Sequence, residues 1–181
     1  MKVLATLLVI AVILGPRAAA AQAVESRSQG PYVFGSVGKG GFAGIDSGAP
    51  EFGGWMFGLG GGYEVRGGWF MEGVVDQLTS YTSDTSGDHG NVTALLGRVG
   101  HRWGHGNSVF RPYLAFAIGT ARDRWVNDYG IDRTANGTVI GAVLGGDVRA
   151  GNRFFVRPEV SLMGGMAEAF WRGSVGVGFR F

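Results

Sequence analysis

Bulky apolar residues alternate with small or charged residues through the last eleven positions of the chain. One parity carries Trp171, Val175, Val177, Phe179 and Phe181, and the other carries only glycine, serine and arginine. A period of two places successive side chains on opposite faces of a β-strand. A face of glycine and charge suits a narrow polar interior, whereas the bulky face suits lipid. We therefore predict a strand over residues 171–181 that directs its large side chains out of a barrel.

The same alternation recurs along the rest of the chain. The clear cases are residues 55–65, 110–119 and 156–162, and the weaker ones are residues 32–41, 69–81, 92–103 and 138–149. In residues 32–41 the pattern is strand-like, but it does not distinguish the two faces. Together with the last segment, these stretches predict eight strands.

The segments between these strands alternate strictly between short and long. Short, glycine-containing joins occur at residues 66–68, 104–107 and 151–153. The long polar or small-residue segments are Ala43–Gly53, Ser80–Gly90, Asp123–Arg133 and Met163–Ala169. Short periplasmic turns and long external loops are typical of bacterial barrels, whose tilted spans need about 9–11 residues. The predicted fold is all-β: an eight-stranded antiparallel up-and-down transmembrane β-barrel.

The N-terminus has the order of a cleavable secretion signal. A basic start at Lys2 is followed by the apolar run Val3–Leu14 and by the small residues Ala18–Ala23. The run is too short for a membrane span of about 20 residues, and the A-x-A tripeptides are typical of a cleavage site. We expect residues 1–23 to be a signal peptide and residues 24–181 to form the barrel domain.

Composition narrows the function classes. The 181 residues include 35 glycines, no cysteine and 12% aromatic residues. The lack of cysteine excludes disulfide scaffolds, thiolate metal sites and iron–sulfur clusters. The aromatic content argues against disorder. Removing the predicted signal takes away Lys2 and Arg17, which leaves 14 basic against 14 acidic residues. The mature chain is then neutral overall, so no nucleic-acid partner is expected.

Charged residues recur on the face predicted to line the lumen. They are Glu64, Glu72, Asp76, Arg98, Arg102, Arg111, Asp147, Arg149, Arg157, Glu159, Arg172 and Arg180. Buried charges of both signs require pairing, and an eight-stranded barrel is only wide enough for side chains to fill it. We predict a charge network that largely plugs the lumen.

Catalysis is not expected. The three histidines, His89, His101 and His105, fall in a long loop, on the lipid side of a strand and in a turn. No strand carries a histidine two residues from a serine, and no histidine–serine–acid arrangement is apparent. Loop acids such as Asp84 and Asp88 have the composition of any polar loop, so neither a metal nor a cofactor is predicted.

The chain resembles the small outer-membrane β-barrels of Gram-negative bacteria, the OmpA-like and opacity-type proteins. The likeness rests on the signal, the eight-strand rhythm, and the segments Arg111–Tyr113, Val156–Glu159 and Gly178–Phe181. It implies outer-membrane lipid as surroundings. It also implies that Phe181, with Phe179 and Val177, serves as the signal read by the barrel assembly machinery.

The expected role is structural or surface-interacting, with an extracellular partner held through the four long segments. Two alternatives remain: a narrow, low-conductance porin, and a soluble exported barrel that binds a ligand inside. The soluble alternative would expose Phe57, Leu59, Leu114, Phe116 and Val175 to water, which is a larger apolar surface than soluble monomers show.

Overall fold

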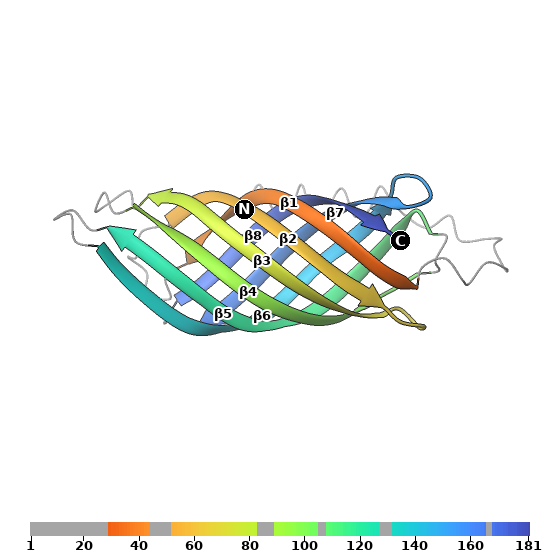
Figure 1. Ribbon diagram of the computed structural model, residues 1–181, viewed down its shortest axis with the longest axis horizontal. Helices are drawn as coiled ribbons and strands as arrows, with labels where there is room; N and C mark the ends of the chain where they lie inside the picture. The colour runs from red at the N-terminus through yellow and green to blue at the C-terminus, as the bar shows by residue number, and fades with distance from the viewer. Residues whose placement is uncertain (1–28, 44–51, 83–88, 105–107, 127–131, 166–167) are drawn as a thin grey trace.

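The computed structural model describes residues 29–43, 52–82, 89–104, 108–126, 132–165 and 168–181. Within these ranges the chain forms one closed antiparallel barrel in which each strand pairs with the next and the last pairs with the first (Figure 1). The strands are β1 (Gly30–Ala43), β2 (Phe52–Glu64), β3 (Trp69–Thr82), β4 (His89–Arg102), β5 (Phe110–Val126), β6 (Asp132–Arg149), β7 (Phe154–Gly165) and β8 (Glu168–Arg180). The predicted eight-stranded up-and-down topology is confirmed. Among the described residues, no helix is long and apolar enough to cross a membrane.

The strand register sets the tilt and the width of the barrel. A path drawn across the ladders from Gly30 of β1 passes through all the other strands and returns to β1 at Gly40, ten residues further along. With eight strands, that stagger tilts them by about 40° to the barrel axis and leaves an interior that side chains fill.

Both ends of the barrel are defined by the connections. The turns after β2, β4 and β6 and the C-terminus lie at one end, here called the turn end, and the opposite end is called the loop end (Figure 1). The predicted signal peptide, residues 1–23, lies outside the described residues. So do the central parts of all four predicted loops.

The strands are longer at the loop end than predicted. β5 continues to Val126 and β6 begins at Asp132, so most of the predicted loop Asp123–Arg133 is paired strand. Ser80–Gly90, Ala43–Gly53 and Met163–Ala169 also give up residues to their flanking strands. The reason is that polar strand residues keep their ladder hydrogen bonds but lose the apolar alternation that makes a strand visible in the sequence.

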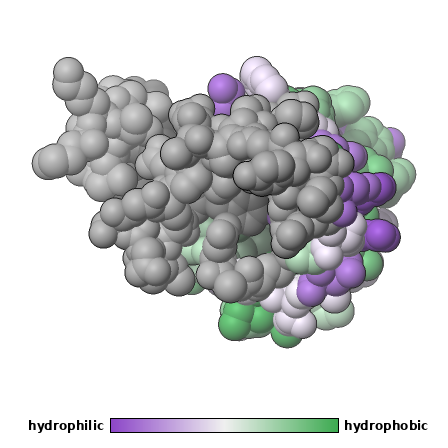
Figure 2. Space-filling model, turned by 90° about the vertical axis from the view of Figure 1, so that its left-hand side faces the viewer, coloured by the Kyte–Doolittle hydropathy of each residue, from purple (hydrophilic) through white to green (hydrophobic). Residues whose placement is uncertain are grey.

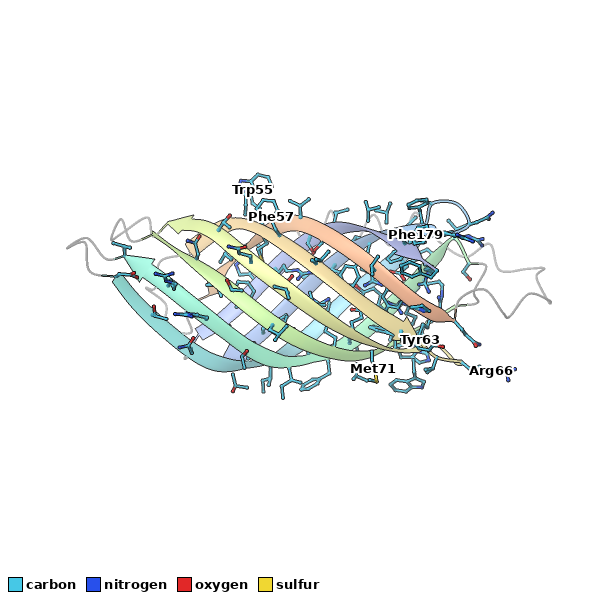
Figure 3. The ribbon with its side chains drawn as sticks, in the orientation of Figure 1. Trp55, Phe57, Tyr63, Arg66, Met71 and Phe179 are labelled. Carbon is cyan, nitrogen blue, oxygen red and sulfur yellow. The ribbon has the colours of Figure 1, made fainter. Side chains whose placement is uncertain are left out.

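An apolar belt surrounds the outer wall. Every strand contributes exposed large apolar side chains, among them Val37, Leu59, Val75, Leu95, Phe116, Leu144, Leu162 and Val175. Trp55, Phe57 and Met71 point away from the wall (Figure 3). Seen from the loop end, hydrophobic residues lie along the outer wall beside hydrophilic ones (Figure 2).

Aromatic residues border this belt at both ends. Around the turn end the exposed aromatic residues are Tyr63, Trp69, Trp103, Phe110, Phe154 and Phe181, and toward the loop end they are Trp55 and Trp171. On β2, Trp55 and Tyr63 are eight residues apart, which at a 40° tilt is about 20 Å along the barrel axis. This height is close to the apolar band of roughly 25 Å on membrane barrels.

Inside the wall, five large aromatic residues each face a glycine on the neighbouring strand. The directly paired residues are Tyr32 and Gly62, Phe34 and Gly60, Phe70 and Gly100, Tyr113 and Gly145, and Phe155 and Gly178. A ring that lies flat along the inner wall needs a neighbour without a side chain. The high glycine content therefore makes room for bulky residues in a narrow interior.

Gly145→Ala should lower the free energy of unfolding by about 1–3 kcal/mol, the usual cost of overpacking. A β-carbon there would lie 2.6 Å from the Tyr113 ring and 2.8 Å from the Pro158 carbonyl oxygen. The matched control is Gly73→Ala, where a β-carbon meets nothing within 4 Å. Urea unfolding of both variants in the same lipid vesicles measures the difference, and equal midpoints would contradict the packing account.

Candidate functional site in the barrel lumen

Buried charged side chains occupy the turn-end half of the lumen. Five acids and six arginines gather there because each holds an inward position on its strand. They are Glu64 on β2, Glu72 and Asp76 on β3, Arg98 and Arg102 on β4, Arg111 on β5, Asp147 on β6, Arg157 and Glu159 on β7, and Arg172 and Arg180 on β8. β1 contributes no charge to this set but places the Tyr32 hydroxyl among them.

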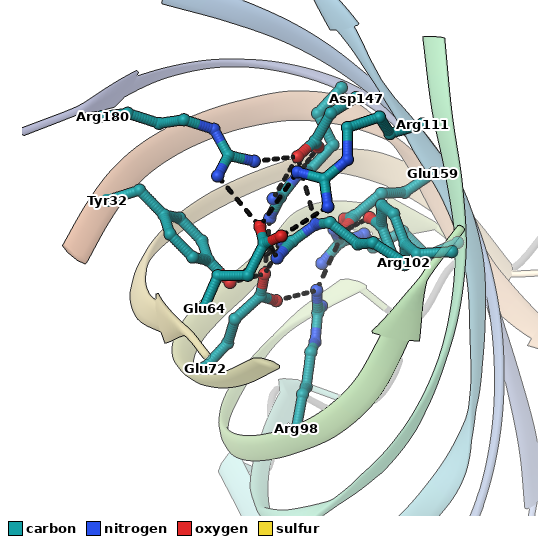
Figure 4. A network of polar contacts seen from close by, with 12 residues as sticks. Tyr32, Glu64, Glu72, Arg98, Arg102, Arg111, Asp147, Glu159 and Arg180 are labelled. Atoms are coloured by element: carbon teal, nitrogen blue, oxygen red, sulfur yellow. Dashed lines mark hydrogen bonds and ion pairs between the residues drawn. The ribbon is translucent and has the colours of Figure 1, made fainter. Parts of the chain in front are cut away.

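Glu64 collects three arginines at the turn end (Figure 4). Its Oε2 accepts hydrogen bonds from Arg102 Nη1 at 3.1 Å and from Arg180 Nη1 at 2.9 Å. Arg111 binds both carboxylate oxygens of Glu64. These four residues come from β2, β4, β5 and β8, so one carboxylate joins strands from opposite sides of the barrel.

Asp147 forms the second centre of the network. Arg157 donates to both of its oxygens, with Nε 2.7 Å from Oδ1. Arg180 Nη2 lies 2.7 Å and Arg102 Nε lies 3.1 Å from Asp147 Oδ2. Two of these guanidinium groups, those of Arg102 and Arg180, also contact Glu64, so the two carboxylates are bridged (Figure 4).

Glu72 lies deeper in the lumen and is equally well surrounded. Its Oε1 accepts hydrogen bonds from the Tyr32 hydroxyl at 2.7 Å, from Arg102 Nη2 at 2.9 Å and from Arg157 Nη1 at 2.7 Å. Arg98 Nη1 lies 3.7 Å from the other carboxylate oxygen. Arg157 thus joins Glu72 on β3 to Asp147 on β6 across the interior.

The part of the network nearest the loop end is built on Glu159. This carboxylate accepts hydrogen bonds from Arg98 Nη1 at 3.1 Å, from the Tyr113 hydroxyl and from Arg172. Arg172 also binds Asp76, and Arg98 Nη2 lies 3.5 Å from the same Asp76 oxygen. Every buried acid of the network therefore has at least two cationic neighbours.

Aromatic rings cover the guanidinium planes. Arg102 lies over Phe70, with 3.8 Å between the guanidinium carbon and the ring centroid. Arg157 lies near both Phe34 at 4.3 Å and Phe155 at 4.9 Å. Stacking on aromatic faces suits the weakly hydrated, planar guanidinium, which explains why the basic members of the network are all arginine.

Arg149 is a correction to the predicted network. It has the inward parity of β6, but it is only half-buried at the strand end. Its Nε donates to the Gly151 carbonyl at 2.8 Å and its Nη2 to Asn152 Oδ1 at 3.4 Å. The nearby turn is thus within reach of its long side chain, so Arg149 braces that turn. The structure brings the other eleven predicted residues together.

Some members of the site were not identified from the sequence. Tyr32 and Phe34 face inward and Val33 and Val37 face outward, which resolves the faces of β1. Residues 32–37 carry apolar side chains on both parities, so alternation gave no signal there. The inward Phe70 and Phe155 were missed because large aromatic residues were expected on the outside.

A layer of apolar side chains follows the charges toward the loop end. Leu78, Val92, Ala94, Val139 and Met163 are all buried. Val92, Ala94, Val139 and Met163, together with Phe170 and Asp76, line a cavity of about 30 Å³, enough for about two water molecules by size. Apart from Asp76 its lining is apolar, and an apolar lining disfavours the entry of ions.

The remaining histidines and carboxylates form no candidate metal site among the described residues. His101 faces outward, with Nε2 2.8 Å from the Gly67 carbonyl oxygen and its ring between Trp69 and Trp103. The His89 side chain and His105 lie outside the described residues.

A closed barrel with an apolar wall, aromatic borders and a charged interior defines the architectural class. The fold matches Neisserial surface protein A from Neisseria with a TM-score of 0.68 at 12% identity, over 83% of this chain and 97% of that one. The N-terminal β-barrel domain of Pseudomonas aeruginosa OprF matches with a TM-score of 0.55 at 21% identity, over 84% and 98%. Ail of Yersinia pestis, solved in complex with the heparin analogue sucrose octasulfate, matches with a TM-score of 0.62 at 12% identity, over 85% and 99%.

At these identities the likeness establishes the fold. The resemblance to small outer-membrane barrels is therefore confirmed at the level of architecture. No protein-family model and no curated protein matches the chain by sequence.

Arg157→Met should lower the free energy of unfolding by about 3–5 kcal/mol, because it removes a cation shared by two buried carboxylates. Arg124→Gln is the control, since its ion pair with Asp132 is about 60% exposed and is worth at most about 1 kcal/mol. Urea titration in vesicles measures both changes. An Arg157→Met midpoint within error of the control would remove Arg157 from any stabilising role.

Proposed function

We propose that this chain is an integral outer-membrane β-barrel with a structural or surface-interaction role and a closed, charge-paired lumen. The observation that carries the proposal is the inverted arrangement of side chains. Large apolar residues cover the outside on all eight strands, whereas arginine–carboxylate pairs occupy the inside. Only surroundings of lipid make that inversion favourable, because water would have to solvate the whole belt.

The lumen is closed by two successive layers. The charged layer is packed, with Arg98, Arg102, Arg157 and Arg172 each about 1% exposed. The apolar layer then follows toward the loop end, and the cavity that its described residues line is about 30 Å³. An ion would have to break paired charges in one layer and pass apolar side chains in the other. These layers favour the closed barrel over the porin alternative.

The interior also disfavours the soluble ligand-binding barrel. A ligand site needs a cavity of about 300 Å³ or more, whereas the cavity lined by described residues is about 30 Å³. Leu59 and Leu95 are 68% and 61% exposed on the outer wall, and contact of such apolar side chains with water is unfavourable. Lipid around the barrel would replace that water.

A surface-interaction role belongs to the same proposal. Two structural neighbours are named a surface protein and an attachment invasion locus protein, and Ail is also described as an outer membrane protein. We expect any extracellular partner to contact the loop end, through the segments Ala43–Gly53, Ser80–Gly90, Asp123–Arg133 and Met163–Ala169. The described residues of these segments belong to the strands, which extend further at that end than the sequence pattern predicts.

The C-terminal residues fit the proposed assembly signal. Val177 and Phe181 are exposed on the outer wall, and the Phe179 ring lies between Phe154 and Phe181 with centroid distances of 5.2 and 5.3 Å. The Phe181 amide donates to the Pro31 carbonyl at 3.2 Å, which fastens the terminus to β1. An exposed aromatic ladder at a terminal strand is the feature that an assembly factor would read.

The absence of cysteine makes membrane insertion directly testable. Single variants Thr134→Cys, Ile118→Cys and Asn152→Cys place a thiol at the loop end, in the belt and in a turn. In intact cells a membrane-impermeant maleimide should label Thr134→Cys, whereas Asn152→Cys should react only after the outer membrane is opened. Ile118→Cys should stay unlabelled in both conditions. Labelling of Ile118→Cys as fast as that of Thr134→Cys would favour the soluble barrel.

Planar-bilayer recordings test the closed lumen. The refolded wild-type chain should give no steady single-channel openings, because both layers block ion passage. Insertion is verified in the same sample by resistance of the barrel to protease. Reproducible openings from inserted protein would contradict the closed lumen and would put the porin alternative first.

A further inference from the structure

Three neighbouring strands extend the outer wall beyond the apolar belt at the loop end. On the outward faces of β5 and β6, Ile118 pairs with Ile140, and Thr120 pairs with Thr138 one step further on. The next outward pairs are Arg122 with Asn136 and Arg124 with Thr134. The change from isoleucine to threonine and then to arginine marks the upper border of the belt.

β4 completes each of these two outer rows. Thr93 pairs with Arg122, and Asn91 pairs with Arg124. The rows are therefore Thr93–Arg122–Asn136 and Asn91–Arg124–Thr134, and all six side chains are exposed. Side chains in register on one face of a sheet lie about 4.5–5.5 Å apart at their β-carbons. We call these six residues the basic rows.

The basic rows present donors around two guanidinium groups. Hydroxyl and amide side chains flank each arginine, and such groups donate hydrogen bonds to phosphate oxygens. Arg124 forms an ion pair with Asp132 at 3.2 Å, in which both side chains are about 60% exposed. No ion pair of Arg122 is found among the described residues. The charge of the rows together with Asp132 is positive.

The height of the rows above the belt matches the lipid headgroups. Two residues along a strand tilted by about 40° correspond to about 5 Å along the barrel axis. Arg122 therefore lies about 5 Å beyond Thr120, and Arg124 about 10 Å. The headgroup layer of a bilayer extends roughly 5–7 Å beyond the hydrocarbon on each side, and arginine side chains span several ångströms more.

We propose that the basic rows bind a phosphate group of an anionic lipid in the leaflet at the loop end. This inference rests on the proposed function, because it requires the belt to lie in a membrane. The rows stand on the same outward face as Ile118 and Ile140, so in a membrane the closest anions outside the protein are those of the surrounding lipid. A soluble polyanion is the competing ligand, and the experiment separates the two.

The test uses the chain refolded into phosphatidylcholine nanodiscs that contain a minor fraction of diphosphorylated lipid A. Native mass spectrometry after release from the disc measures the fraction of barrels that retain lipid A. The double variant Arg122→Gln with Arg124→Gln should reduce this retention about ten-fold, as expected for the loss of charge-assisted hydrogen bonds. Replacing both arginines by lysine should restore part of it, because lysine keeps the charge without the bidentate geometry.

Arg66→Gln is the matched control, since Arg66 is an exposed arginine at the opposite end of the barrel (Figure 3). It should retain lipid A as the wild type does. An equal loss in Arg66→Gln would show that any surface cation suffices and would overturn the proposal. So would unchanged retention in the double glutamine variant.

Two further measurements separate the possible failures. Insertion into pure phosphatidylcholine nanodiscs, followed by protease resistance, tests the proposed function alone, and every variant is required to pass it. Sucrose octasulfate added to these discs tests the soluble competitor. If the wild type binds it, the double glutamine variant does not, and neither retains lipid A, the rows are a polyanion site and the lipid proposal is overturned.

Discussion

Pairing of buried charges is the constraint on which the rest of this barrel depends. Strand alternation sends every second residue into a lumen too narrow for bulk water, and several of these residues are arginine or carboxylate. Each such group is costly to bury unless it has partners, and the partners lie on other strands. Glu64 gathers arginines from β4, β5 and β8, and Arg157 joins β3 to β6. The network therefore connects strands across the interior as well as around the wall.

Glycine leaves room for that network because it has no side chain. A lumen that holds six arginines and several inward aromatic rings has no volume left for side chains at every position. The rings of Tyr32, Phe34 and Tyr113 each face a glycine on the next strand, which lets them lie against the wall and leave the axis to the guanidinium groups. Tyr32 then donates to Glu72, and Tyr113 to Glu159, so the aromatic lining is also part of the polar pairing.

Much of this arrangement could be predicted from sequence, because alternation is a local property. The inward parity of β2, β4, β5, β7 and β8 was readable wherever one face was bulky and the other small or charged. β1 was not, since Tyr32, Val33 and Phe34 are large on both faces, and only closure against β2 and β8 distinguishes them. Arg149 shows a second limit: parity fixes the direction of the β-carbon, but a long side chain at a strand end turns to the nearest carbonyl. The partners of each charge depend on the stagger of ten residues around the barrel, which no single segment encodes.

The two ends of the barrel differ in the residues that they place inside and outside the wall. At the turn end, exposed aromatic residues on most strands surround the densest part of the charge network, so the aromatic border outside and the ion pairs inside lie at the same height. At the loop end, the interior becomes apolar, and the outer wall of β4, β5 and β6 becomes polar and basic. Among the described residues, Arg122 and Arg124 are exposed on the outside at that end. If the barrel lies in a membrane as proposed, the basic rows are the part of the described strands that meets the lipid headgroups at this end.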